Sequence, residues 1–230
     1  MKSSLLKSFF FAVAACLLTA QVPLSAQDQQ NITLQFLSFP RANNPDPVEL
    51  LIPGKEPIEV EIPTNRLSRS YTVPKSSEWV VGETVVGEDG KKAFNVLGRA
   101  NALNAESQLL LLIRKGKDSS DGFLIRPMNN NESTFGGGHF LFMNATNLDI
   151  AGQVGGEKFA IRTGKHSIIL PRSESGENSF HAMFYFRSEN ETKPFLSTRW
   201  PVSESARSLV FFYNDPSSER IRLHSIRSYR

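Results

Sequence analysis

Cysteine is almost absent from this sequence of 230 residues, which contains only Cys16. Disulfides within one chain are therefore excluded, and packing alone must stabilise the fold. About 200 residues are enough to bury a core of that kind. Long hydrophobic runs are missing as well, because no apolar stretch after residue 26 approaches the roughly 20 residues of a membrane-spanning helix. We expect no transmembrane segment in that part of the chain.

Tryptophan and tyrosine are scarce, whereas phenylalanine is abundant: the sequence has 2 Trp, 4 Tyr and 17 Phe. Carbohydrate sites on β-sandwiches usually need exposed flat rings with a polar group, and Phe has no such group. We therefore interpret most of the aromatic residues as core residues. This composition leaves few residues for a glycan-binding surface.

A surplus of charge is also missing. The formal net charge is +3, but Lys2 and Lys7 precede residue 26 and no acid does, so the rest of the chain carries only +1. This near balance removes the electrostatic argument for a nucleic-acid partner. The distribution is uneven, with a local −4 over residues 27–62 and +4 over the last eleven residues. Opposite charge can steer head-to-tail self-association, giving a homo-oligomer, or pair the two ends within one fold.

The first 26 residues have the three parts of a secretory signal peptide. Lys2 and Lys7 precede an apolar core, and "VPLSA" supplies small residues before a predicted cleavage after Ala26. The pattern predicts export to the periplasm or the cell exterior, and a cysteine-free exported chain fits a bacterial envelope. A competing interpretation treats "VAAC" as a lipoprotein box that would anchor the protein at Cys16. The apolar stretch after Cys16 argues against it, because a polar tether is expected there.

Patterns typical of β-strands dominate after residue 30. "ITLQF" places Ile32, Leu34 and Phe36 on one face, and "IEVEI" alternates apolar residues with Glu59 and Glu61 on a wet face. Many other apolar runs of strand length are separated by turns rich in Gly, Pro, Asn and Asp. Short strands at such spacing predict an all-β sandwich or barrel.

The order of these strands occurs twice. "FLSF", "IEVEI", "TVP", "WVVGETVV", "QLLLLI" and "GFLIRPM" correspond to "FLFM", "KFAI", "HSIILP", "SFHAMFYF", "SLVFFY" and "RIRLHSI". Equivalent positions include Arg99 with Arg199 and Leu109 with Leu209. We predict two tandem, internally duplicated β-sandwich-like halves after a cleaved signal peptide. The predicted segments are the signal peptide 1–26, half one 27–128, a polar glycine-rich linker 129–138, and half two 139–230.

No catalytic motif is recognisable. The sequence has no G-x-S-x-G elbow, H-E-x-x-H helix or phosphate loop. Its four histidines are far apart, and "NATNLD" (144–149) is better explained as an Asn-rich turn than as a calcium loop. We therefore expect no enzyme, no cofactor and no metal. A hydrolase whose residues meet only in the folded chain is a third alternative, and it requires acidic side chains paired in a pocket.

Two groups of residues are candidates for binding. Arg199 and Trp200, at the entrance of an apolar strand, can form a ligand platform or a structural corner. Because Arg99 recurs in the first half without a Trp beside it, the arginine is better explained as structural. The second group is basic, Arg220, Arg222 and Arg227 in "RIRLHSIRSYR". These arginines protect a sheet edge from aggregation or contact an anionic polymer or lipid surface.

The second half of the chain carries a weak family resemblance. "FLFMNAT", "GGEKFAIRTGKHSIILP" and "RWPV...RSLVFFY" resemble uncharacterised secreted β-sandwich proteins of environmental Gram-negative-like bacteria. That resemblance implies no activity and no site residue. The sequence favours an exported, non-enzymatic structural or protein-interaction module of the bacterial envelope that binds an unknown envelope protein or an anionic polymer. The alternative is a glycan-binding module that uses the loops around Trp200.

Overall fold

The computed structural model describes residues 30–40, 45–115, 121–172, 177–188, 191–215 and 218–229. The predicted signal peptide, with Cys16, lies outside the described residues. Within these ranges no helix is long and apolar enough to cross a membrane. Strands and turns account for nearly all of the described chain, as the alternating patterns predict.

The described chain folds into two sets of eight strands separated by one short helix. The first half contains β1 (Asn31–Phe39), β2 (Val48–Leu50), β3 (Ile58–Val60), β4 (Tyr71–Pro74), β5 (Glu78–Val86), β6 (Lys92–Asn101), β7 (Ser107–Arg114) and β8 (Phe123–Asn129). Helix α1 (Glu132–Phe135) follows. The second half contains β9 (Phe140–Ala145), β10 (Asp149–Val154), β11 (Glu157–Ile161), β12 (His166–Ile169), β13 (Ser179–Ser188), β14 (Glu191–Pro201), β15 (Ala206–Asn214) and β16 (Ile221–Tyr229).

Four sheets of four strands result, and the two halves have the same topology. In the first half, sheet A has the order β4-β1-β7-β8 and sheet B the order β3-β2-β5-β6. In the second half, sheet C has the order β12-β9-β15-β16 and sheet D the order β11-β10-β13-β14. Each strand of one half thus has a counterpart at the same place in the other. The predicted all-β duplication is confirmed.

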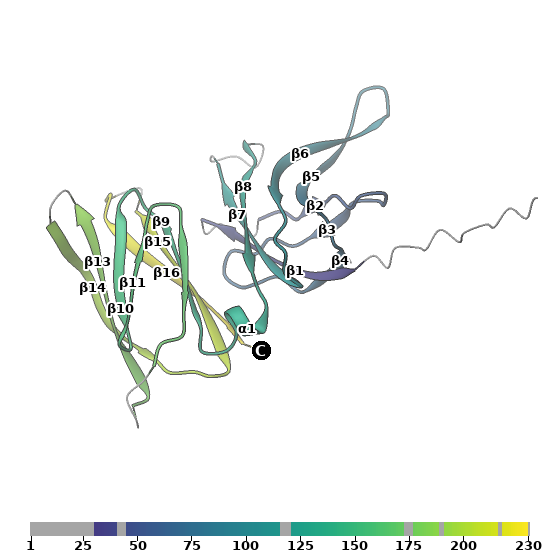
Figure 1. Cartoon of the computed structure of the whole chain (residues 1–230). Coiled ribbons are helices and arrows are strands. Elements are labelled where there is room, and N and C mark those ends of the chain that lie inside the picture. Colours follow the sequence, from purple (N-terminus) through teal and green to yellow (C-terminus); the bar gives the residue numbers. More distant parts are fainter. Residues whose placement is uncertain are drawn as a thin grey trace, which may run out of the picture.

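Three hydrophobic clusters show how the sheets are stacked. One cluster joins sheet A to sheet B, and another joins sheet C to sheet D. A third cluster, here called the seam cluster, joins sheet A to sheet C across the two halves. The layers therefore follow the order B, A, C, D (Figure 1). Sheets B and D are the outermost layers, and each has one face that no other sheet of the described chain covers.

The central strands β7 and β15 explain the two most apolar runs of the sequence. Leu109 and Leu209 point into the seam cluster, whereas Leu110 and Val210 point into the cores of their own halves. A strand buried on both faces must be apolar at successive positions, which replaces the usual alternation with a continuous run. Both strands also pair in parallel with the first strand of their half, β7 with β1 and β15 with β9.

The seam cluster is a genuine core between the halves. It contains Leu37, Phe39, Leu67, Leu109, Leu111, Met128, Phe135, Leu141, Met143, Leu209, Phe211 and Ile226, all buried. The rings of Phe39 and Phe211 stack across it with centroids 4.9 Å apart. Phe135 enters it from α1, within the predicted linker, so this segment is itself packed between the halves.

We predict that the two halves unfold together. Separating them would expose the seam cluster on both sheets, and burial of apolar surface is the main force that stabilises folds. Trp79 lies in the first half and Trp200 in the second, so the fluorescence of the chain reports on both halves. If the halves unfold together, fluorescence and far-UV circular dichroism should follow one coincident urea transition. Two separated transitions would show that the halves are independent domains.

Candidate functional site

Arg199 and Trp200 lie on opposite faces of β14. Successive residues of a strand alternate between the two faces of a sheet. Arg199 is exposed and pairs in register with the exposed His181, whereas Trp200 pairs with the buried Phe180. The two side chains therefore cannot form a joint platform. Their first-half counterparts, Arg99 and Ala100, also lie on opposite faces of their strand. Arg99 is exposed beside Glu78, with 3.7 Å between Arg99 Nη1 and Glu78 Oε2.

Trp200 packs into the core of the second half. Its ring stacks on Phe140 with centroids 5.4 Å apart and an interplanar angle of 6°, and it lies 5.3 Å from the Phe184 ring. Gly152 makes room for this aromatic cluster, since a β-carbon there would lie 2.5 Å from the Phe159 ring and 2.9 Å from that of Phe184. One face of the indole is thus already occupied by the protein itself. This arrangement weakens the case for a glycan platform at Trp200.

The basic residues of the C-terminal strand do not share one face. Arg222 and Arg227 are both exposed on β16, an edge strand of sheet C. They are five positions apart in a strand whose pairing with β15 is continuous, so they project to opposite faces. Arg222 Nε lies 3.3 Å from Asp215 Oδ2, and Arg220 is exposed just before the strand. The three arginines selected from the sequence therefore do not form one basic surface.

Arg207, which sequence reasoning missed, lies buried where the halves meet. It is 2% exposed and projects from β15. Its Nη1 donates to Asn130 Oδ1 at 2.6 Å and to the Phe135 carbonyl oxygen at 3.0 Å, and its Nη2 donates to Gln35 Oε1 at 3.1 Å. The guanidinium also lies 4.8 Å from the centroid of the Phe135 ring. One side chain of the second half thus holds the linker helix and β1 together.

Burial lowers the pKa of Arg207 to about 10, because desolvation disfavours its charged form. The side chain is still charged at neutral pH. Within the described ranges, no ion pair joins it to a carboxylate. Its charge is therefore balanced by amide and carbonyl oxygens and by a ring face.

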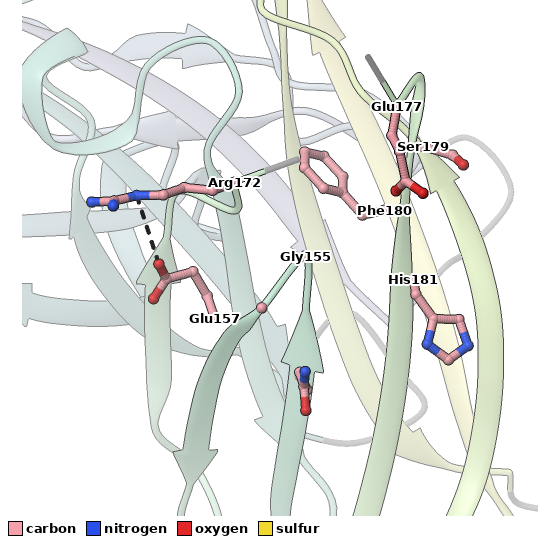
Figure 2. Close-up of a pocket in the computed structure, with 9 residues that line it drawn as sticks. Gly155, Glu157, Arg172, Glu177, Ser179, Phe180 and His181 are labelled. Atoms are coloured by element: carbon pink, nitrogen blue, oxygen red, sulfur yellow. Dashed lines mark ion pairs between the residues drawn. The ribbon is translucent and has the colours of Figure 1, made fainter. Parts of the chain in front are cut away.

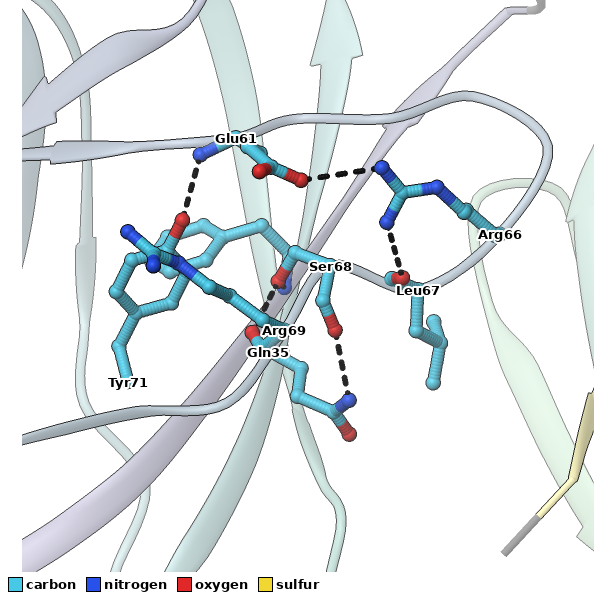
Figure 3. A network of polar contacts seen from close by, with 8 residues as sticks. Gln35, Glu61, Arg66, Leu67, Ser68, Arg69 and Tyr71 are labelled. Carbon is cyan, nitrogen blue, oxygen red and sulfur yellow. Dashed lines mark hydrogen bonds and ion pairs between the residues drawn. The ribbon is translucent and has the colours of Figure 1, made fainter.

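Gln35 extends this polar network into the first half (Figure 3). Its Nε2 donates to the Ser68 carbonyl oxygen at 2.9 Å, and the Ser68 hydroxyl accepts the Phe36 amide at 2.8 Å. Further along the same loop, the Tyr71 hydroxyl accepts the Glu61 amide at 2.9 Å. These bonds anchor the loop that leads into β4 against β1. The network fixes Gln35, which in turn positions an acceptor for Arg207.

A polar cavity of about 300 Å³ lies beside Arg207, where the two halves meet. It is lined by Thr33, Gln35, Ser70, Ser107, Asn130, Glu132, Arg207, Ser228 and Tyr229. Because the two terminal nitrogens of Arg207 already bond to Gln35, Asn130 and Phe135, the arrangement is better explained as a structural tie than as a ligand site.

A second pocket, of about 470 Å³, opens at one end of sheet D (Figure 2). Glu157, Glu177, Arg172 and His181 contribute its charged and titratable side chains. Glu157 Oε1 lies 3.9 Å from Arg172 Nε, and Figure 2 shows its carboxylate directed toward that arginine rather than toward Glu177. This geometry does not provide the pair of facing carboxylates that a glycoside hydrolase needs.

No family model and no curated protein match this chain. The site must therefore be argued from its own residues. Within the described ranges, no three His, Cys, Asp or Glu residues gather where they could hold a metal ion. Asn144, in the Asn-rich turn, is fully buried and donates from Nδ2 to the carbonyl oxygens of Leu148 and Ile161. Its Oδ1 accepts from the Thr146 amide and hydroxyl, so the side chain shapes the turn.

The outer face of sheet D carries an apolar row between basic side chains. Cross-strand pairing aligns Ala160, Ala151, Tyr185 and Pro194, and Met183 lies in the adjacent row. All of them are at least partly exposed. Around this row stand three exposed bases, Lys158, Arg187 and Arg199. Arg199, selected from the sequence, thus belongs to a broad sheet surface.

The outer face of sheet B has a similar apolar strip with acidic neighbours. Leu51, Val80, Phe94 and Val96 are partly exposed there, the last 38%. Glu49 and Glu59 stand directly opposite each other on β2 and β3 at the side of this strip. Strand alternation puts Glu78, Arg99 and Lys92 on this face as well, and Glu78 is paired with Arg99. Three acids against two bases leave the uncovered face of sheet B slightly negative.

Proposed function

We propose that this protein is an exported, non-enzymatic interaction module of the bacterial envelope that binds protein partners through its outer sheets. One observation carries the proposal: sheets B and D each present an apolar row that no described part of the chain covers. Isolated exposed apolar residues are common on protein surfaces, whereas contiguous patches mark interaction sites. The sequence of the first 26 residues supports export.

The packing of the Trp200 ring against other aromatic rings favours protein binding over glycan binding. A flat sugar ring stacks on an exposed aromatic face, and here the indole packs among Phe140, Phe142 and Phe184. Tyr185 is the aromatic residue that sheet D turns outward, beside Met183. Tyr and Met are both typical of protein interfaces.

An affinity experiment with the immobilised protein tests the proposal. We expect one envelope protein to be retained at both low and high salt, because apolar contacts are not screened. Retention should fall at least about tenfold when Tyr185→Ser is combined with Met183→Ser, since interface aromatics often contribute more than 1 kcal/mol. Arg172→Ala, an exposed change at the rim of the second pocket, is the matched control.

Other outcomes would point elsewhere. Retention on an insoluble polysaccharide that survives salt and is lost in Trp200→Ala would contradict the proposal in favour of a glycan module. Binding to an anionic polymer that salt abolishes, and that Arg220→Ala with Arg222→Ala removes, would assign the interaction to the basic strand instead.

A further inference from the structure

We infer that the outer face of sheet B in one copy binds the outer face of sheet D in the next, so that the protein assembles head to tail. The inference rests on the proposed function, because it uses the same two outer faces, and it adds a salt-sensitive contact with a second copy of the chain. It is carried by the charges and apolar rows of the two faces and by their place at opposite ends of the stack.

The face of sheet B carries two acids, Glu49 and Glu59, whose charges no ion pair neutralises within the described ranges. Thr84 Oγ1 donates to Glu49 Oε2, and Glu59 interacts electrostatically with Arg69. Glu49 lies directly opposite Glu59 across β2 and β3, and like charges in this position destabilise a strand pair. A base from another molecule would relieve the repulsion between Glu49 and Glu59.

The face of sheet D carries the complementary charges. Lys158, Arg187 and Arg199 are exposed there, and none of them is in an ion pair within the part of the chain that the structure describes. Asp149 is the acid opposite Arg187, and its Oδ1 accepts the Thr163 amide at 3.4 Å. Three bases against one acid leave this face positive.

The centres of the two faces are suited to sheet packing. Sheets stack about 10 Å apart when their facing side chains are apolar and of moderate size. Leu51, Val80, Phe94 and Val96 on one face would meet Ala151, Ala160, Tyr185, Met183 and Pro194 on the other. The charges lie beside these strips, where they select the partner face and orient it.

The seam within the chain shows that such packing suits these sheets. Sheet A of the first half packs on sheet C of the second half through the seam cluster. Contact of sheet B with sheet D between copies would again pair a first-half sheet with a second-half sheet. Because the two faces differ and lie at opposite ends of the stack, a two-fold dimer cannot satisfy both, and the contact generates an open chain or a ring.

Charge reversal on each face tests this inference. One variant combines Glu49→Lys with Glu59→Lys, and the other combines Arg187→Glu with Arg199→Glu. Sedimentation velocity of the purified protein at rising concentration should show oligomers for the wild type at low salt, and fewer of them at about 1 M salt, where the screening length is about 3 Å. Each variant alone should be monomeric, because facing like charges weaken association at least about a hundredfold.

Mixing the two variants is the decisive measurement. The reversed faces are complementary to each other, and each variant keeps one native face, so oligomers should return in the mixture. Lys115→Glu with Lys165→Glu changes the net charge by the same amount as the sheet D variant, but away from both faces, and should assemble as the wild type does. A wild type that stays monomeric at every concentration overturns the inference, as does a closed dimer that only one variant disrupts, or a mixture that stays monomeric.

The two proposals fail in different ways. A monomeric protein that still retains an envelope protein through Tyr185 and Met183 would end the head-to-tail inference and keep the proposed function. A protein that binds polysaccharide through Trp200 would end the proposed function, whatever its oligomeric state.

Discussion

Arg207→Ala is expected to destabilise the protein by about 3–5 kcal/mol, close to the largest loss a single side chain can cause. The substitution removes three hydrogen bonds and a cation–π contact, and it leaves a cavity between the halves. For a chain of this size the melting temperature should fall by roughly 10 °C. Urea unfolding followed by circular dichroism measures the free-energy change directly.

Two further substitutions separate the roles of charge and shape at this position. Arg207→Lys keeps the charge but loses the planar fork that reaches Asn130, Phe135 and Gln35 together, so most of the loss should persist. Arg207→Met also removes the charge but fills much of the same space, so it should cost less than Arg207→Ala because it leaves a smaller cavity.

The loss of unfolding free energy in Arg207→Met should not vary with pH around neutrality. Burial lowers the pKa of Arg207 to about 10, below its ordinary value, so the unfolded chain holds this proton more tightly than the folded chain does. Stability gained by releasing the proton would therefore appear only as the pH rises above about 10. Arg199→Ala, an exposed arginine, is the control and should change stability by no more than about 0.5 kcal/mol. A similar small change in Arg207→Ala would show that the arginine does not hold the halves together.

The strands and their duplication were accessible from the sequence because both depend on local pattern. The alternation in "IEVEI" correctly predicts that Val60 is buried and Glu59 exposed. The order of apolar runs also carries the repeat, since each run corresponds to a strand at the same place in its half. Pairing order is different, because no local signal shows that β1 lies beside β7 rather than β2.

The role of Arg207 could not be predicted for a related reason. An arginine at the start of an apolar run normally marks a strand entrance in solvent, and only the stacking of sheet A on sheet C buries it. Phe135 gave a weak signal, as the single apolar residue in the polar segment 129–138. By contrast, the adjacency of Arg199 and Trp200 was misleading, because neighbours along a strand point to opposite faces.

Trp79→Ala is expected to cost about 3–5 kcal/mol, the usual range for an aromatic residue deleted from a core. Trp79 is fully buried between sheets A and B, and its Nε1 donates to Gln108 Oε1 at 3.0 Å. Gln108, also fully buried, accepts the Leu103 amide at 3.1 Å as well. Trp79→Phe should therefore cost only about 1–2 kcal/mol, because it keeps most of the apolar volume and leaves Gln108 one donor.

Trp200 provides the comparison for Trp79, because these are the 2 tryptophans of the chain and each variant leaves the other as a fluorescent reporter. In the first half the large ring is on β5 opposite Ala100, whereas in the second half it is on β14 opposite Phe180. Trp200 is partly exposed and has no indole bond equivalent to that of Trp79 among the described contacts, so Trp200→Ala should cost less than Trp79→Ala. Urea unfolding of both variants measures the difference. A larger loss for Trp200→Ala would mean that stacking with Phe140, Phe142 and Phe184 outweighs complete burial and the bond to Gln108.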